Sequence, residues 1–244
     1  MLLKSIAALL TAGLVAAAPA SNSSTAGSPS YNTTYAAGPP TVIVKNQCSK
    51  KLTVGHSVDV DYYGETTEVA PGDSVTLTIP MNWSGRVWGR ENCSGKEDCF
   101  KSGMTSPASL AEFHFMDSGK VFYDISFVNG FNLPIVVEPV NKIDLKHGDE
   151  SLCRTSTCTN LPACPTEFQT FDGEGNFAGC KSACTHFQTD EYCCTGDYYS
   201  AEACSTYSWA SDVKAACPDV YSYAFDDVNS AFMCTSNAYT VTFC

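Results

Sequence analysis

Residues 110–132 read LAEFHFMDSGKVFYDISFVNGFN and decide how this chain folds. In the first arm Phe113 and Phe115 share one face of an extended chain, while Glu112 takes the other. The second arm alternates in the same way around Asp124. Aspartate and glycine, both turn-forming residues, lie between the arms, so the stretch predicts a β-hairpin with one aromatic face and one polar face.

The polar face of this hairpin carries two acids. If the turn centres near Ser118, Glu112 and Asp124 become direct cross-strand partners. Two carboxylates at that spacing repel each other, so the pair needs a cation, a shifted pKa or a use. Glycoside hydrolysis is such a use, because one acid donates a proton and the other supports the sugar cation or activates water. The alternative is a pair of solvated strand acids in a register that has slipped.

The sparse and mostly acidic charge narrows the range of ligands. The 244 residues include 14 basic and 26 acidic side chains, which gives a net charge of −12. Nucleic acids and anionic membranes need a basic footprint, so we expect neither as a partner, and a neutral polysaccharide is compatible. A chain of this length buries a sizeable core in one or two domains.

The cysteines indicate the redox compartment. There are 14 of them, an even number, and none precedes Cys48. Behind a secretory signal this pattern favours seven disulfides over a zinc site, because thiols oxidise outside the cell. We therefore expect neither a metal nor a cofactor.

Residues 1–40 have the pattern of a targeting segment followed by a tether. Met1–Ala20 has one basic residue, Lys4, then a short apolar run and small residues, which is typical of a secretory signal peptide. Residues 21–40 are rich in Ser, Thr, Gly and Pro and predict a flexible tether. We expect no transmembrane segment elsewhere. Acceptor motifs for N-glycosylation start at Asn22, Asn32, Asn82 and Asn92.

Residues 41–244 predict a mainly β domain with a second, loop-rich lobe. Short alternating runs punctuated by Gly and Pro are typical of a sandwich or a barrel, with the core at about 41–148 and 217–244. The lobe, at about 149–216, is dense in cysteine and lacks long alternating strands, so we expect disulfides to hold it. A short helix is predicted there from Cys180 or Lys181 to Phe187. Outside the hairpin the strand runs are 41–46, 51–60, 68–69, 74–79, 86–88, 133–140 and 239–244.

Seven stretches carry a family resemblance. They read VKNQCSKKLTV, GRVWGREN, SLAEFHF, FYDISFVNGFNLP, CKSACTHFQTDEYCC, CPDVYSYAFDD and AYTVTFC. Across residues 42–244 they resemble the thaumatin-like (pathogenesis-related class 5) family in order and spacing. The resemblance implies a β-sandwich core beside a smaller disulfide-rich lobe, with an acidic cleft between them. It also implies the pairs Cys48–Cys244, Cys93–Cys99, Cys153–Cys234, Cys158–Cys217, Cys164–Cys180, Cys184–Cys193 and Cys194–Cys204.

The acidic cleft of that family carries one arginine, one glutamate and three aspartates. The matching positions here are Arg86, Glu112, Asp124, Asn129 and Asp226, with Asp227 as an alternative to Asp226. Asn129 is a departure, because an amide hydrogen-bonds a sugar hydroxyl but cannot act as a base. The resemblance therefore leaves Glu112 and Asp124 as the candidates for chemistry.

Two further features differ from many plant members of the family. The loop between Cys93 and Cys99 has room for one disulfide, where many plant members have a longer loop with two. The Ser/Thr-rich tether resembles that of fungal members. We therefore expect a fungal-type secreted protein.

The expected function is β-1,3-glucan binding with internal hydrolysis of the chain. Glu112, crowded by Asp124, should have a raised pKa and act as general acid, while Asp124 stays ionised. Arg86 either orients these acids or neutralises a structural acid cluster, and His114 either assists proton transfer or is structural. We expect a secreted monomer whose partner is the β-1,3-glucan of cell walls. The alternatives are a non-catalytic glucan-binding or membrane-permeabilising antifungal protein, and an inhibitor of secreted enzymes.

Overall fold

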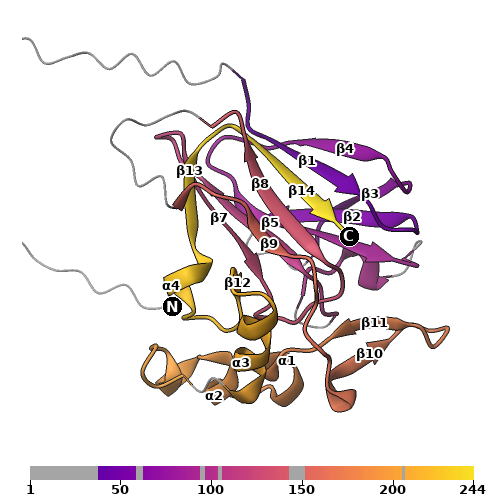
Figure 1. The fold of residues 1–244 in the computed structure, drawn as a ribbon, viewed down its shortest axis with the longest axis vertical. Coiled ribbons are helices and arrows are strands. Elements are labelled where there is room, and N and C mark those ends of the chain that lie inside the picture. The colour runs from indigo at the N-terminus through magenta and orange to yellow at the C-terminus, as the bar shows by residue number, and fades with distance from the viewer. Residues whose placement is uncertain (1–37, 59–62, 94–96, 104–105, 143–151, 205–206) are drawn as a thin grey trace, which may run out of the picture. The chain divides into compact units, whose positions relative to one another are not determined.

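The computed structural model of this chain describes residues 38–58, 63–93, 97–103, 106–142, 152–204 and 207–244. These residues belong to one compact unit, Tyr35–Cys244. Two β-sheets lie one behind the other, and most of the helices lie with a small β-hairpin below them (Figure 1). The expected signal peptide falls outside the described residues.

The first sheet has five strands in the order β4-β1-β14-β8-β9. β1 runs parallel to β14 and antiparallel to β4. Alternation along the central strands buries Val42 and Val44 of β1 on the same face as their partners Tyr239 and Val241 of β14. The strands are β1 (Thr41–Asn46), β4 (Ser74–Thr78), β8 (Ile135–Val140), β9 (Ser156–Cys158) and β14 (Ala238–Phe243).

The second sheet has seven strands and contains the predicted hairpin as β6 and β7. Six strands follow the order β12-β7-β6-β5-β2-β3, and β13 also pairs with β7. Gly119 has a φ of 78°, a conformation that glycine adopts readily, in the turn that joins β6 to β7. The strands are β2 (Leu52–Val58), β3 (Glu65–Val69), β5 (Ser84–Glu91), β6 (Leu110–Phe115), β7 (Lys120–Ser126), β12 (Val220–Tyr221) and β13 (Phe232–Thr235).

Aromatic side chains join the two sheets. The ring of Tyr239, from the first sheet, lies 5.2 Å from Phe113, 5.8 Å from Phe115 and 5.1 Å from Tyr123, all from the second sheet. These four side chains are at most 3% exposed, so they form a dry layer between the sheets. The core is therefore a β-sandwich, as predicted, rather than a closed barrel.

The disulfide-rich lobe, residues 159–216 after strand β9, is built from short elements. The structure holds seven disulfides in the pairs that the family resemblance implies, and three of them lie wholly within this lobe. Its elements are β10 (Gln169–Phe171), β11 (Phe177–Cys180), α1 (Ala183–Phe187), α2 (Asp190–Cys193), α3 (Tyr207–Ala216) and 3-10 turns at Thr166–Phe168 and Gly196–Tyr198. A 3-10 turn at Glu97–Phe100 and helix α4 (Asp227–Ser230) lie outside it.

The helix predicted in this lobe starts later than expected. Cys180 belongs to strand β11, and Ser182 caps the helix by accepting a hydrogen bond from the backbone N–H of Thr185. The Thr185 hydroxyl accepts in turn from the Ser182 backbone N–H at 2.8 Å, which completes a capping box. The structure therefore corrects the start to Ala183, because the capping serine cannot lie inside the helix.

Candidate functional site

Three side chains form a row across the open face of the second sheet. The strand register places Arg86 of β5 opposite Glu112 of β6, and Glu112 opposite Asp124 of β7. Ala111 and Phe113, the neighbours of Glu112, point into the core and are buried. The hairpin register therefore agrees with the expected one, and both acids lie on the same face.

The arginine lies close to the first acid. Arg86 Nε is 3.7 Å from Glu112 Oε1, and Arg86 is only 9% exposed. A buried guanidinium offsets the repulsion between two adjacent carboxylates. Arg86 is therefore a cation of the kind that the paired carboxylates of Glu112 and Asp124 require.

The two acids open into a pocket of about 260 Å³. Asn129 also lines it, from the turn after β7 in which the Gly130 backbone N–H donates to the Phe127 carbonyl at 2.8 Å. The structure thus brings together three of the predicted site residues, with Arg86 beside them. The full lining is Glu112, Asp124, Ser126, Val128, Asn129, Tyr221 and Ala224.

Tyr221 is one of four lining residues that sequence reasoning missed, with Ser126, Val128 and Ala224. It belongs to the two-residue strand β12, which runs parallel to β7 and pairs Tyr221 with Ser126. Its hydroxyl donates to Asp227 Oδ1 at 2.8 Å. Burial raises the pKa of Tyr221 strongly, and the hydrogen bond to Asp227 and the negative charge of Asp124 add to the shift. The phenol therefore keeps its proton and remains a donor at the pocket wall.

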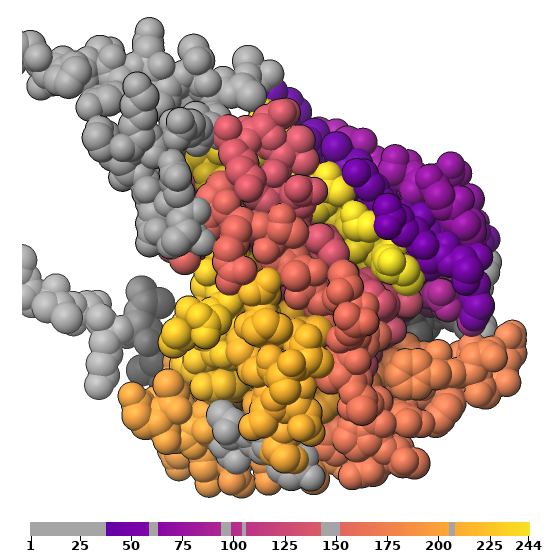
Figure 2. Space-filling model, viewed as in Figure 1, coloured from indigo at the N-terminus to yellow at the C-terminus, as the bar shows by residue number. Residues whose placement is uncertain are grey.

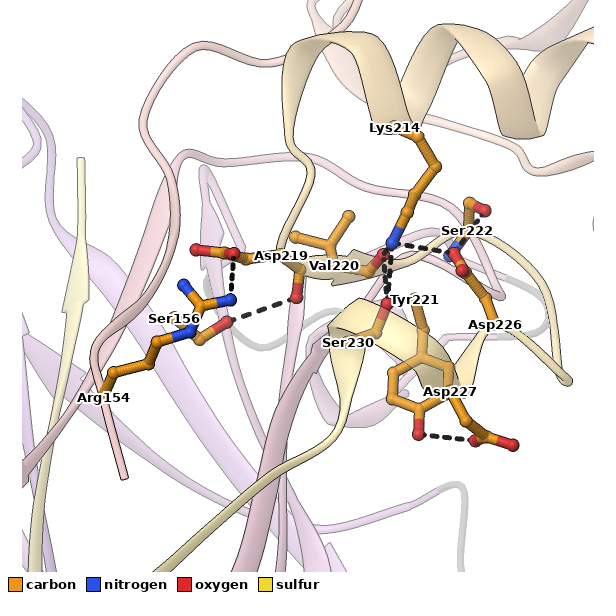
Figure 3. A network of polar contacts seen from close by, with 10 residues as sticks. All are labelled: Arg154, Ser156, Lys214, Asp219, Val220, Tyr221, Ser222, Asp226, Asp227 and Ser230. Carbon is orange, nitrogen blue, oxygen red and sulfur yellow. Dashed lines mark hydrogen bonds and ion pairs between the residues drawn. The ribbon is translucent and has the colours of Figure 1, made fainter. Parts of the chain in front are cut away.

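A lysine-centred network holds the segment that carries β12, the strand paired with β7 (Figure 3). Lys214 Nζ donates to the Val220 carbonyl at 3.1 Å and to Ser230 Oγ at 2.8 Å. The same ammonium lies 3.1 Å from Asp226 Oδ2, which also accepts from the backbone N–H and the hydroxyl of Ser222. The network holds the backbone that carries Tyr221, and it places Asp226 beside the pocket rather than in its lining.

The remaining predicted residues lie around the site or away from it. His114 is exposed on the same face as Glu112, opposite Ser84 and Phe122. Asn82 and Asn92 are exposed and have positive φ angles of 59° and 53°, and their glycosylation stays a prediction. The other two acceptor motifs, at Asn22 and Asn32, lie outside the described residues.

A β-sandwich with a disulfide-rich lobe and paired acids on its open face defines the class of protein. The model of the thaumatin family matches residues 46–244 of this chain. The chain therefore belongs to the thaumatin family.

Plant proteins are among the curated relatives of the chain. Pathogenesis-related thaumatin-like protein 3.5 of Cryptomeria japonica is 42% identical over 193 residues, which cover 72% of this chain and 76% of the relative. A protein of Prunus avium named glucan endo-1,3-beta-glucosidase is 36% identical over 227 residues, which cover 84% of this chain and 90% of the relative. The expectation of a fungal-type member finds no support in these relatives.

A solved structure shares the fold. A laminaripentaose-producing beta-1,3-glucanase in complex with laminaritetraose aligns with a TM-score of 0.51 and 11% identity over 84% of this chain and 98% of that chain. At this identity the likeness concerns the fold alone. In the described part of this chain, the helices are too short or too polar to span a bilayer.

Proposed function

We propose that this protein is secreted, binds β-1,3-glucan in the Glu112–Asp124 pocket and hydrolyses the chain internally. The observation that carries the proposal is the direct cross-strand pairing of the two acids within one pocket. The relative named glucan endo-1,3-beta-glucosidase supports the choice of substrate. Paired carboxyl groups on a rigid sheet match the acid pair that glycoside hydrolysis requires.

The two acids take different roles in the proposed reaction. Glu112 donates a proton to the glycosidic oxygen, and the bond from that oxygen to the anomeric carbon breaks. Asp124 stays ionised and either stabilises the oxocarbenium ion or activates the attacking water. Arg86 holds Glu112 in place through the contact between Nε and Oε1.

Neutral polar groups around the acids hold the substrate. The Asn129 amide and the Ser126 hydroxyl both line the pocket and suit the hydroxyl groups of glucose units. Tyr221 adds a phenol that donates to Asp227 and keeps its proton. Apart from the acid pair, the pocket is therefore suited to a neutral, hydroxyl-rich ligand.

Glu112→Gln tests the catalytic assignment. We expect release of reducing sugar from laminarin to fall by about 100-fold or more, because the amide cannot donate the proton. Retention on insoluble β-1,3-glucan should persist, because the amide still forms hydrogen bonds. Glu138→Gln is the matched control, since Glu138 is exposed on the other sheet. Unchanged sugar release from Glu112→Gln protein would remove Glu112 from the mechanism.

Glucan binding without hydrolysis is the second candidate function, and one contact favours it. The guanidinium of Arg86 stabilises the charged form of Glu112, which is the wrong form for a proton donor. If the protein binds glucan without hydrolysing it, the wild-type protein is retained on insoluble glucan but releases no sugar from laminarin. A protein that is not retained on glucan at all would fit an inhibitor of secreted enzymes.

The proposed location follows from the first 20 residues. Their signal-peptide pattern and the oxidised state of all 14 cysteines support secretion to the medium or the cell wall. Secretion is tested by expression of the full chain in a eukaryotic host and N-terminal sequencing of protein from the medium.

A further inference from the structure

A second hollow, of about 430 Å³, lies beside the β10–β11 hairpin. This groove runs between the hairpin, the end of strand β5 near Arg90, and the backbone around Pro107 and Asn132. Figures 1 and 2 show the hairpin, in orange, projecting from the lobe beneath the sheets. Among the described residues, the groove and the acidic pocket share no lining residue.

Two phenylalanine rings form one wall of the groove. Phe171 and Phe177 are direct cross-strand partners in the hairpin and both line the groove. They are 57% and 46% exposed, which is high for two neighbouring apolar rings. Direct partners point to the same face of a hairpin, so both rings form one apolar platform.

The platform stands on a fixed backbone. Asp172 Oδ1 accepts hydrogen bonds from the backbone N–H groups of Glu174 and Asn176, each at 2.9 Å, and so fixes the hairpin turn. The Thr170 hydroxyl donates to the Gly179 carbonyl at 2.8 Å across the two strands. Since these bonds set the hairpin before any ligand arrives, little ordering entropy opposes binding at the rings.

The charged groups in the groove are largely compensated. The Arg90 guanidinium donates to the carbonyls of Lys101, Ser106 and Pro107. Glu91 Oε2 lies 3.3 Å from the ammonium of Lys50. The four charged side chains that line the groove, Arg90, Glu91, Asp172 and Lys181, carry two positive and two negative charges, so the groove presents little net charge to a ligand.

We propose that this groove is a second saccharide-binding site, which takes one or two neutral sugar rings of a polysaccharide. A pyranose ring has apolar C–H faces, which pack on aromatic rings such as Phe171 and Phe177, and a hydroxyl rim. Lys181 and Asn92, which also line the groove, offer polar groups for that rim. The volume lies within the range of small-ligand sites, and the compensated charges match an uncharged ligand.

The site is independent of the acidic pocket and needs no catalysis. It gives the protein a second point of attachment to a polysaccharide chain or to a neighbouring chain. Two attachment points raise the effective affinity for a polymer without stronger binding at either site.

Affinity electrophoresis in native gels tests the proposal. The full-length protein is run in gels that contain laminarin, arabinoxylan or mannan, and a gel without polysaccharide is the reference. All variants carry Glu112→Gln to suppress hydrolysis and Ser94→Ala, which removes the glycosylation motif at Asn92 but keeps the Asn92 amide in the groove. The variants are Phe171→Ala/Phe177→Ala, Phe171→Leu/Phe177→Leu and Phe171→Tyr/Phe177→Tyr, and Tyr63→Ala is a control for loss of an exposed ring elsewhere.

We expect at least one polysaccharide to retard the parent protein. The double alanine and double leucine variants should show a dissociation constant raised by about tenfold. The double tyrosine variant and the Tyr63→Ala control should behave as the parent does, because a flat ring is kept in the groove. Thermal unfolding of each variant checks that the fold is retained.

Three results would overturn the proposal. The first is no retardation of the parent in any gel, and the second is equal retardation of the double alanine variant. The third is full retention by the double leucine variant, which would indicate a general apolar surface for a protein partner. Because Glu112 is replaced throughout, failure here leaves the proposed hydrolysis untouched, and failure of hydrolysis leaves this test valid.

Discussion

The sandwich core and the disulfide-rich lobe solve the problem of stability in different ways. Between the sheets, Phe113, Tyr123 and Tyr239 pack as buried rings contributed by strands far apart in the sequence. The lobe has short strands and mostly short helices, and its ring pair Phe168 and Trp209, 5.8 Å apart, is a small cluster by comparison. Covalent links therefore replace apolar burial where the chain cannot form long strands.

The candidate site combines residues from the sandwich core with a residue whose position depends on the lobe. Glu112 and Asp124 come from the sandwich, where strand register fixes their spacing. Tyr221 comes from the segment that returns from the lobe, and Lys214 of helix α3 holds that segment in place. A change in the core should therefore act on the whole molecule, and a change in the lobe should act locally.

The largest expected effect is in the core. Phe113→Ala should lower the free energy of unfolding by about 3–5 kcal/mol, because it leaves a cavity next to Tyr239 and Phe115. Urea unfolding measures the change. Phe122→Ala is the control, since Phe122 is 44% exposed on the opposite face of the same hairpin and should cost far less. Equal losses in the two variants would contradict the assignment of faces.

Removal of one lobe disulfide should have a smaller and local effect. Cys164→Ala/Cys180→Ala opens a loop with a sequence separation of 16, and the expected cost is about 3 kcal/mol. Hydrogen exchange should increase in β10, β11 and α1 while the strands of the two sheets stay protected. Loss of protection throughout the sandwich would show that the two regions are not energetically distinct.

Alkaline pH should destabilise the core through its tyrosines. Burial raises the pKa of Tyr123 and of Tyr239 well above the ordinary value near 10. Above pH 10 the unfolded chain therefore releases these protons while the folded chain keeps them, so stability falls as pH rises. Between about pH 8 and pH 10.5 the two residues together should cost about 2 kcal/mol, measured by urea unfolding at each pH.

Tyr239→Phe sharpens the alkaline experiment. Within the described residues the Tyr239 hydroxyl has no hydrogen-bond partner, so its removal should not lower stability at neutral pH. The fall in stability at alkaline pH should become shallower, because one titrating group is lost. An unchanged pH dependence in this variant would exclude Tyr239 as a source of the effect.

The smallest expected effect is at the pocket wall. Tyr221→Phe removes the hydrogen bond to Asp227 and should cost about 1 kcal/mol of stability. Retention on insoluble glucan should weaken several-fold, measured by the free protein fraction at a series of glucan concentrations. Tyr223→Phe, outside the pocket lining, is the control, and equal weakening in both variants would rule out a specific role for Tyr221.

The hairpin and its acid pair were predictable from sequence for a physical reason. The period of two places Phe113 and Tyr123 on one face and the two acids on the other, and a turn centred near Ser118 sets the register that pairs Glu112 with Asp124. The pairing of the cysteines was different, because spacing alone allows many connectivities. There the family resemblance, rather than the physical pattern, supplied the answer.

The missed features are short or lie among the cysteines. Strand β12 has two residues, too few to show a period, so Tyr221 carried no signal for a place in the pocket. Helix α3 did carry one, since Trp209, Val213 and Cys217 are buried at a spacing of four. This helical spacing was overlooked because the surrounding cysteine-rich sequence predicts loops. The β10–β11 hairpin, with strands of three and four residues, was likewise below the length at which alternation is informative.

The position of β14 constrains how the chain is made. This strand follows every other strand in the sequence, yet it lies in the middle of its sheet, between β1 and β8. During synthesis β1 leaves the ribosome early. It cannot form its parallel pairing with β14 until β14 has also emerged. The first sheet therefore closes only after nearly the whole chain has emerged, and until then an aggregation-prone strand edge stays open to chaperones.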